Sequence, residues 1–189
     1  MSETRDFPLP ANLPRPVDDG AADHLRGLFL PRVGLPSTAG RMVDLSDTSG
    51  STTVVFCYPM TGVPGKALPE GWDLIPGARG CTPQTCGFRD LHQDFVQLGA
   101  NVFGLSTQTT EYQREMVTRL HVPFEILSDA RFALCDALQL PTFELEGRRL
   151  LKRLTLVVQR GRIGHVFYPV FPPDQSANEA LRWLREHHG

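Results

Sequence analysis

The sequence is poor in cysteine, in long apolar runs and in net charge, and each shortage excludes a class of protein. Four cysteines are too few to cross-link 189 residues as a disulfide scaffold. No window approaches the roughly 18 apolar residues of a membrane-spanning helix, and residues 1–6 lack the apolar stretch of a secretory signal. A formal net charge of -2 gives no electrostatic reason to bind nucleic acid or an anionic membrane. We therefore expect a soluble cytoplasmic protein.

The remaining composition is that of one globular domain. Hydrophobic residues make up 41% of the chain and charged residues 21%, and the length suffices to bury a core. Residues 1–27 are rich in proline and acidic side chains, and only residues 21–26 could form a short helix. We expect an N-terminal extension over residues 1–27 and a single domain over residues 28–189.

The apolar pattern predicts a mixed α/β fold. A β-branched and aromatic run over residues 52–58 indicates a central strand buried on both faces. Apolar residues at spacings of three and four predict a helix over residues 83–98. The other predicted elements are strands at 42–45, 101–106 and 124–127, helices at 110–121 (with Thr110 as cap), 130–140 and 176–187, and a hairpin of strands 154–159 and 163–168.

Residues 60–80 contain many glycines and prolines, and they lead directly to a pair of cysteines. A loop of about twenty residues inside a compact domain is more often functional than idle. Cys81 follows the loop at the start of the predicted helix, where free N–H groups and the helix dipole favour a thiolate. Arg79 could add to this effect if it turned inward. The sequence therefore predicts a reactive thiol at Cys81.

The second cysteine of the pair, Cys86, lies five residues further along the same predicted helix. Residues i and i+5 of an intact helix have Cα atoms about 8–9 Å apart, whereas a disulfide needs Cα atoms within about 7 Å. The two thiols can therefore bond only if the first helical turn unwinds. That behaviour suits a switchable redox pair better than a permanent cross-link.

The segment GCTPQTCGFRD at residues 80–90 resembles the active-site helix of the bacterioferritin-comigratory protein and peroxiredoxin Q branch of the peroxiredoxins. The resemblance runs from about Leu35 to the C-terminus. Its further matches are LPSTAG at 35–40, the strand ending in Tyr58 and Pro59, VFGLS at 102–106, LSD at 127–129, and Arg153 before the strand 154–158.

This resemblance implies a thioredoxin-like fold, with a mixed central sheet flanked by helices, and a thiol peroxidase. Cys81 would reduce hydrogen peroxide and organic hydroperoxides, and its sulfenic acid would form a disulfide with Cys86. Arg153 would stabilise the thiolate and the transition state. The partners implied are a peroxide and a thioredoxin or similar dithiol reductant, and the protein would be a monomer or weak homodimer. No cofactor and no metal are expected, because sulfur itself carries the electrons.

The sequence departs from the family pattern in the loop before Cys81. The family has a threonine three residues before the cysteine, and this chain has Ala78 there. Residues 63–75 look like an insertion. The candidates to position the peroxide are therefore Thr61, folding back to the site, Thr82, Gln84 or backbone N–H groups.

The four cysteines admit other interpretations. Cys57, on the buried strand, and Cys135 are expected to lie in the core, and the Cys81–Cys86 spacing does not match common zinc sites. A thioredoxin-like disulfide oxidoreductase is an alternative, because residues 140–142 resemble the apolar-Pro-Thr loop of those enzymes. Their motif is Cys-x-x-Cys, however, and the region after Pro141 reads as a turn. A redox sensor using the same cysteine pair is a second alternative.

Overall fold

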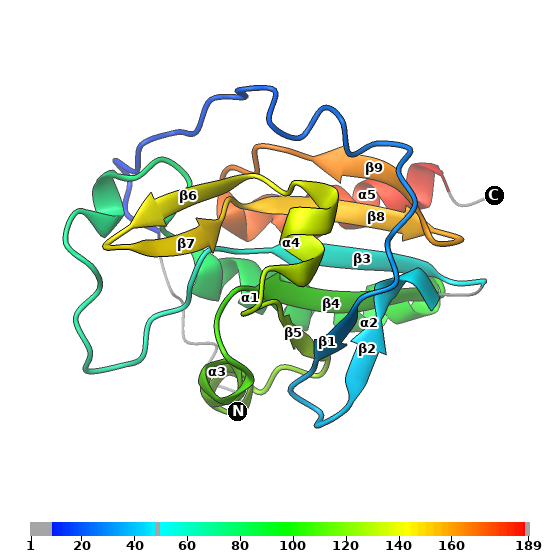
Figure 1. Cartoon of the computed structure of the whole chain (residues 1–189), viewed down its shortest axis with the longest axis horizontal. Helices are drawn as coiled ribbons and strands as arrows, with labels where there is room; N and C mark the ends of the chain where they lie inside the picture. Colours follow the sequence, from blue (N-terminus) through cyan, green and yellow to red (C-terminus); the bar gives the residue numbers. More distant parts are fainter. Residues whose placement is uncertain (1–8, 48–49, 188–189) are drawn as a thin grey trace.

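The computed structural model describes residues 9–47 and 50–187, and these residues form a mixed sheet flanked by helices (Figure 1). The predicted central strand is β3 (Thr52–Cys57), which pairs in parallel with β4 (Ala100–Ser106) and antiparallel with β8 (Leu154–Gln159). β5 (Ile126–Ser128) and β9 (Arg162–Phe167) form the two edges, so the order is β5-β4-β3-β8-β9. The prediction of a mixed α/β sheet is confirmed.

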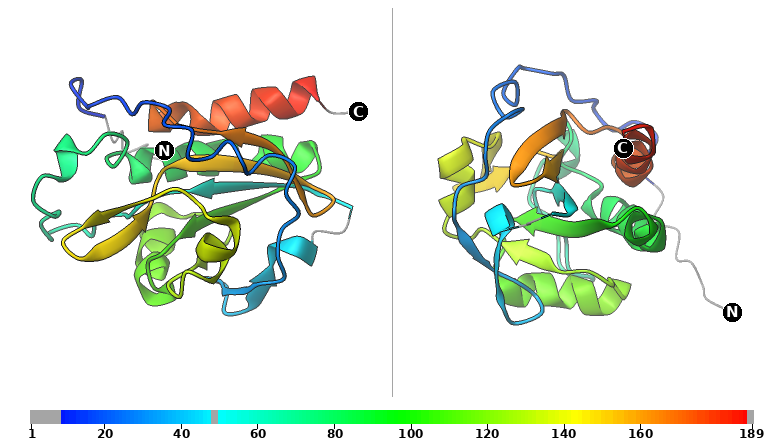
Figure 2. Two further views of the ribbon diagram at one scale, coloured as in Figure 1. Left: turned by 45° about the horizontal axis from the view of Figure 1, so that its top comes forward. Right: turned by 90° about the vertical axis from the view of Figure 1, so that its right-hand side faces the viewer.

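Both faces of the sheet are covered, because β3 alternates its side chains between two apolar clusters. Val54 and Phe56 pack with four helices on one face, and Val55 and Cys57 pack with α4, β1 and β2 on the other. Figure 2 shows this separation edge-on. The covering elements are β1 (Gly34–Pro36), β2 (Met42–Asp44), α1 (Cys81–Asp90), α2 (His92–Gln97), α3 (Thr110–Leu120), α4 (Ala133–Leu138) and α5 (Ser176–Glu186), with short 3-10 turns η1 (Leu45–Asp47) and η3 (Pro173–Gln175).

The helix predicted over residues 83–98 is two helices. α1 begins at Cys81, and Leu91, at φ -96° and ψ 6°, interrupts the helix before α2. The apolar spacing still holds across the break, since the rings of Phe88 and Phe95 pack 5.6 Å apart. The periodicity therefore located the buried face and missed the bend in the backbone.

Two other helices differ from their predicted limits at the N-terminal end. The cap of α3 is Thr109 rather than Thr110: Thr109 is extended, and its hydroxyl accepts from the Tyr112 N–H at 3.4 Å. α4 begins only after Phe132, which has a positive φ of 58°, so the helix is shorter than the predicted 130–140. These ends depend on single backbone angles that apolar spacing does not report.

A hairpin of β6 (Thr142–Leu145) and β7 (Arg148–Leu151) was not predicted. Its turn is Glu146–Gly147, both with positive φ, which is the geometry of a two-residue hairpin turn. The polar residues of this stretch look turn-like because one face of the hairpin is exposed. A strand therefore does follow Pro141, and that argument against a disulfide oxidoreductase is wrong. The argument from cysteine spacing is unaffected.

The N-terminal segment crosses the surface of the molecule and ends in the core (Figure 1). Residues 21–27 form hydrogen-bonded turns, including Leu25 N–H to Ala22 C=O at 3.1 Å, rather than the predicted short helix. Leu25 is fully buried against the β1–β2 and α4 side of the sheet.

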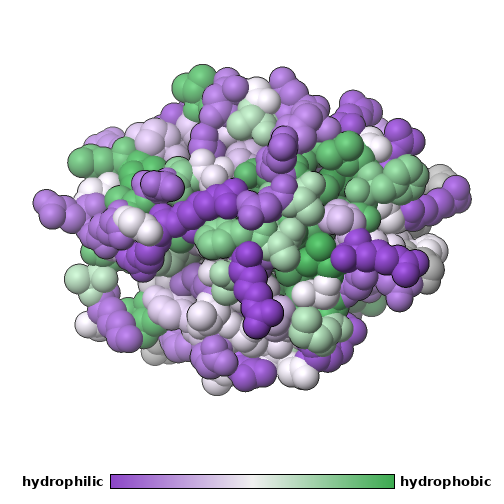
Figure 3. Space-filling model, viewed as in Figure 1, coloured by the Kyte–Doolittle hydropathy of each residue, from purple (hydrophilic) through white to green (hydrophobic). Residues whose placement is uncertain are grey.

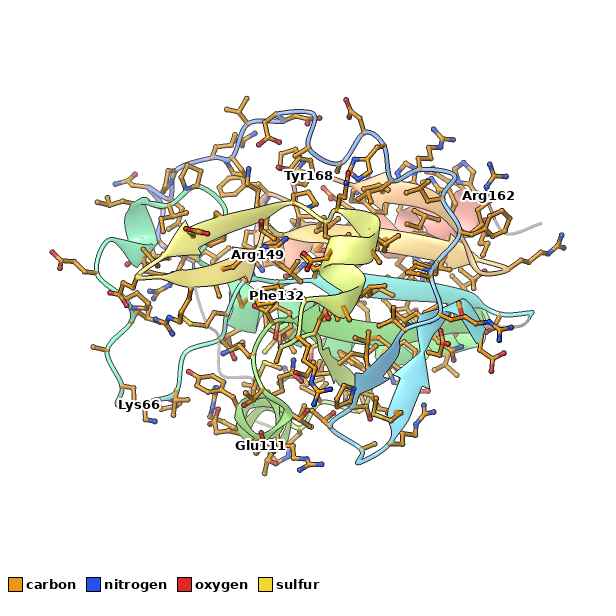
Figure 4. All side chains as sticks on the ribbon, in the orientation of Figure 1. Lys66, Glu111, Phe132, Arg149, Arg162 and Tyr168 are labelled. Atoms are coloured by element: carbon orange, nitrogen blue, oxygen red, sulfur yellow. The ribbon has the colours of Figure 1, made fainter. Side chains whose placement is uncertain are left out.

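The predicted loop leaves β3 and returns at α1, and its single regular turn is η2 (Trp72–Leu74). In the space-filling view it stands away from the body at the lower left, beside a hollow (Figure 3). Trp72 is buried in a small cluster with Met60, Ala78 and Leu150. The far part of the loop is exposed, and Lys66 lies at its outer edge (Figure 4). Within the described residues, no helix is long and apolar enough to cross a membrane.

Candidate active site

Cys81 is the first residue of α1 and is almost fully buried, at 4% exposure. The preceding Gly80 has φ 110°, a conformation that L side chains rarely adopt. A Cβ at Gly80 would also lie only 2.3 Å from Pro173 Cγ. Glycine is therefore required at the turn that presents Cys81 at the helix N-terminus.

Arg153 is the charged residue that contacts the Cys81 sulfur. It lies between β7 and β8, is 3% exposed, and its Nη2 donates to Cys81 Sγ at 3.1 Å. As a thiol, Cys81 donates weakly to the Ala78 carbonyl oxygen at 3.7 Å. The guanidinium therefore places a buried positive charge in hydrogen-bonding contact with the sulfur.

Arg153 also holds the loop that leads to Cys81. Its Nε donates to the Gly77 carbonyl at 3.3 Å, and its Nη2 donates to the carbonyls of Ala78 and Arg79 at 3.0 and 3.3 Å. Nη1 donates to Gln84 Oε1. A planar guanidinium can serve all these acceptors at once, and a lysine cannot.

The side chain of Arg79 does not turn toward Cys81. Its Nη1 pairs with Asp73 Oδ1 at 2.9 Å, and both side chains are partly exposed. Of the two arginines that the sequence offered, Arg153 contacts the sulfur.

A cavity of about 410 Å³ opens in front of Cys81. Thr61 and Thr82 both line it, so the structure brings two of the three candidate positioning residues to the thiol. Gln84 does not line it, because its side chain is buried behind α1 on Arg153 and Ser176. The other lining residues are Leu9, Met60, Gly62, Val63, Pro64, Gly65, Lys66, Leu68, Trp72, Arg79, Gly80, Pro83 and Arg119.

Thr61 is held in place by Gln108, a residue that the sequence analysis missed. The Thr61 N–H and hydroxyl donate to Gln108 Oε1 at 3.0 and 3.3 Å, and Gln108 Nε2 donates to the Thr61 carbonyl at 3.3 Å. The two residues follow the parallel strands β3 and β4, and carboxyl ends of parallel strands meet at one edge of the sheet. The position of Gln108 just after a strand that neighbours the one before Thr61 was the sequence signal that could have identified it.

Cys86 lies five residues along α1 and is half-buried, and all four cysteines are reduced. Burial raises the pKa of the Cys86 thiol; by smaller amounts, nearby Arg89 lowers this pKa and Asp90 raises it. Both cysteines of the pair therefore sit in an intact helix, and the buried second thiol is disfavoured as a thiolate there.

Cys57 and Cys135 are fully buried in one apolar cluster, as predicted. Burial raises the pKa of Cys57 far above its usual range and that of Cys135 to about 11. Neither thiol lines the cavity at Cys81, and burial disfavours the thiolate form of each. Among the residues described, no group of three or more His, Cys, Asp and Glu side chains is arranged to hold a metal ion.

Comparisons with known proteins agree with this geometry. The family model described as Redoxin matches residues 26–181. Peroxiredoxin Bcp of Escherichia coli (strain K12) is 27% identical over 165 residues, covering 85% of this chain and 96% of that protein. Chloroplastic Peroxiredoxin Q of Sedum lineare is 28% identical over 160 residues, covering 85% and 77%. The crystal structure of peroxidoxin BcpB from Mycobacterium tuberculosis superposes with a TM-score of 0.69 at 27% identity, covering 85% and 96%.

A thioredoxin-like mixed sheet with a buried cysteine at a helix N-terminus defines a thiol-based redox protein, and the chain belongs to the redoxin family. Within that family it falls in the peroxiredoxin branch that contains Bcp and peroxiredoxin Q. The fold and the branch that the sequence predicted are confirmed. A peroxiredoxin uses a peroxide as substrate and a thiol as reductant.

Proposed function

We propose that this peroxidase reduces hydrogen peroxide and organic hydroperoxides through Cys81, and that Cys86 resolves the oxidised thiol. The observation that carries the proposal is the 3.1 Å contact of Arg153 Nη2 with the Sγ of Cys81, a residue that lines the cavity. It places a fixed cation on a cysteine that lines a space large enough for a peroxide.

In the first step the Cys81 thiolate attacks the terminal oxygen of the peroxide. A sulfur–oxygen bond forms as the oxygen–oxygen bond breaks, sulfur loses two electrons, and the leaving alkoxide or hydroxide takes a proton to become alcohol or water. Arg153 stabilises the charge that spreads over sulfur and the two oxygens. Thr61, held by Gln108, and Thr82 supply hydroxyls on the cavity wall that orient the peroxide.

In the second step the Cys86 thiolate attacks the sulfur of the Cys81 sulfenic acid, and the departing hydroxide leaves as water. An intact α1 keeps the two thiols too far apart for the bond. The first turn must therefore unwind, which also releases Cys86 from the burial that raises its pKa.

The disulfide is then reduced by exchange with a dithiol. The reductant that we propose is a thioredoxin or similar protein of the cytoplasm, acting on a monomer or weak homodimer. Unwinding exposes both sulfurs, so such a reductant can reach the disulfide, whereas in the folded helix Cys81 is buried and Cys86 half-buried.

Three cysteine variants test the proposal. Cys81→Ser should consume no peroxide. Cys86→Ser should consume about one equivalent, stall with thioredoxin as donor, and over-oxidise readily. Cys135→Ala, which removes a buried thiol outside the site, should keep turnover. Peroxide loss and intact mass, followed with thioredoxin and its reductase, measure all three. Normal turnover by Cys86→Ser would contradict the intramolecular disulfide, and peroxide consumption by Cys81→Ser would contradict the assignment of the nucleophile.

A further inference from the structure

Behind Cys81, four buried polar side chains form a continuous hydrogen-bonded relay. Arg153 Nη1 donates to Gln84 Oε1, Gln84 Nε2 donates to Ser176 Oγ at 3.2 Å, and Ser176 Oγ lies 3.0 Å from Thr155 Oγ1. All four residues are at most 3% exposed. The relay therefore connects Arg153, which contacts the Cys81 thiol, to α1 through Gln84, to the start of α5 through Ser176 and to β8 through Thr155.

The same C-terminal segment also supports α1 by direct packing. Pro173 lies so close to Gly80 that no side chain fits between them. At the other end of the first two turns, the Asp174 carbonyl oxygen would lie 3.3 Å from a Cβ at Gly87. Ser176 thus adds a side-chain hydrogen bond to the close packing of residues 173–177 beneath the first two turns of α1.

We infer that Ser176 is a positioning residue with opposite effects on the two steps of the proposed peroxidase cycle. By fixing Gln84, it holds Arg153 on Cys81 Sγ and so accelerates the reaction with peroxide. By the same contact it holds the first turn of α1 folded and so slows formation of the Cys81–Cys86 disulfide. This inference rests on the proposed function.

The opposite signs follow from the position of Gln84. It lies between Cys81 and Cys86, in the turns that must unwind before the thiols can meet. Unwinding carries the Gln84 side chain away from Ser176, so the 3.2 Å bond is present in the first step and lost in the second. Because the Gln84–Ser176 bond forms only while α1 is helical, it favours the peroxide reaction of the folded helix and opposes the unwinding that disulfide formation needs.

The test is Ser176→Ala, which deletes the hydroxyl and leaves the close packing beneath α1. Because one buried hydrogen bond is removed, we expect the peroxide reaction to slow about three- to tenfold and disulfide formation to accelerate about three- to tenfold. Stopped-flow tryptophan fluorescence, with Trp72 on the cavity wall, follows the first step. Acid quenching, trapping and mass measurement follow the second. Hydrogen exchange in the reduced protein should rise over residues 81–88 and stay unchanged in β3 and β4.

Two variants keep the test decisive. Thr155→Val removes the last link and leaves Ser176 bonded to Gln84, so it should shift both rates in the same sense as Ser176→Ala, by a smaller factor. Thr53→Val is the control. Thr53 lies on the central strand β3, and its buried hydroxyl has no hydrogen-bond partner, so the substitution should change neither rate.

Unchanged rates in Ser176→Ala, or two rates that move in the same direction, would overturn the inference while the peroxidase cycle stood. Failure of the cycle itself has a separate signature, because the wild-type protein would then form no sulfenic acid at Cys81 when peroxide is added.

Discussion

At the scale of single residues, the site depends on one cation that serves two purposes. Arg153 contacts the Cys81 sulfur and also binds the carbonyls of the loop that positions it. A side chain with one charged nitrogen could replace the charge but not the set of contacts. The geometry of the guanidinium is therefore as important as its charge.

Arg153→Lys should slow the reaction with peroxide by about a hundredfold, the loss typical of removing a preorganised donor from a developing charge. Stopped-flow fluorescence at fixed pH measures the rate, and circular dichroism checks that the fold is kept. Arg185→Lys is the matched control, because Arg185 pairs with Asp94 and does not line the cavity. Equal losses in the two variants would contradict a special role for Arg153.

The raised pKa of Cys86 predicts how resolution depends on pH. Burial in α1 raises this pKa above the value of about 8.5 expected for a free thiol. Since the unwound state releases its proton first, the folded turn is most stable below that pH and loses stability as the pH rises. Disulfide formation should therefore accelerate as the pH passes about 8.5. Single-turnover quenching between about pH 7 and 9.5 checks this, and a flat profile would contradict it.

At the scale of elements, the insertion at residues 63–75 forms one wall of the cavity in front of Cys81 and anchors itself through Trp72. The anchor packs against Met60, Leu150 and Phe143, from the unpredicted β6–β7 hairpin and the end of β3. The hairpin thus packs against the anchor of the insertion, and the insertion itself lines the cavity.

Leu68→Ala should widen the entrance and raise the rate with cumene hydroperoxide relative to hydrogen peroxide by about tenfold, because pocket volume discriminates at this level. Leu68 lines the cavity, and the ratio of the two second-order rate constants is the measurement. Leu74→Ala is the control, since Leu74 belongs to the same loop, does not line that cavity and is 79% exposed. An unchanged ratio in Leu68→Ala would mean that the insertion does not select substrates.

At the scale of the whole molecule, the sheet separates two apolar layers, and the N-terminal segment completes one of them. Ala22, Leu25 and Leu30 cover the face that also carries β1, β2 and α4. Leu9, in the same N-terminal segment, lines the cavity at Cys81. Residues that the sequence suggests are an appendage thus contribute to the core and to the site.

Leu25→Ala should lower the free energy of unfolding by about 2–5 kcal/mol, as expected for a fully buried leucine. Val17→Ala, in the same segment but 82% exposed, should change it by less than about 0.5 kcal/mol. Denaturant unfolding of both variants gives the comparison. A loss for Leu25→Ala as small as that for Val17→Ala would show that the segment does not stabilise the domain.

The sequence by itself determined the central strand, the mixed sheet and the placement of Cys81 at a helix start. These depend on local signals, namely a β-branched run, the spacing of apolar residues and a glycine before the helix. It also indicated Arg153 as the arginine of the site through a family resemblance.

Only the tertiary structure decided which side chains meet. Thr61 reaches the cavity from the end of β3 and is fixed by Gln108 from the end of β4, 47 positions along the chain. Gln84 contacts Arg153 and Ser176 rather than lining the cavity, because the start of α5 packs behind α1. Such contacts are set by the way elements stack, and that information is not carried by residue spacing along one element.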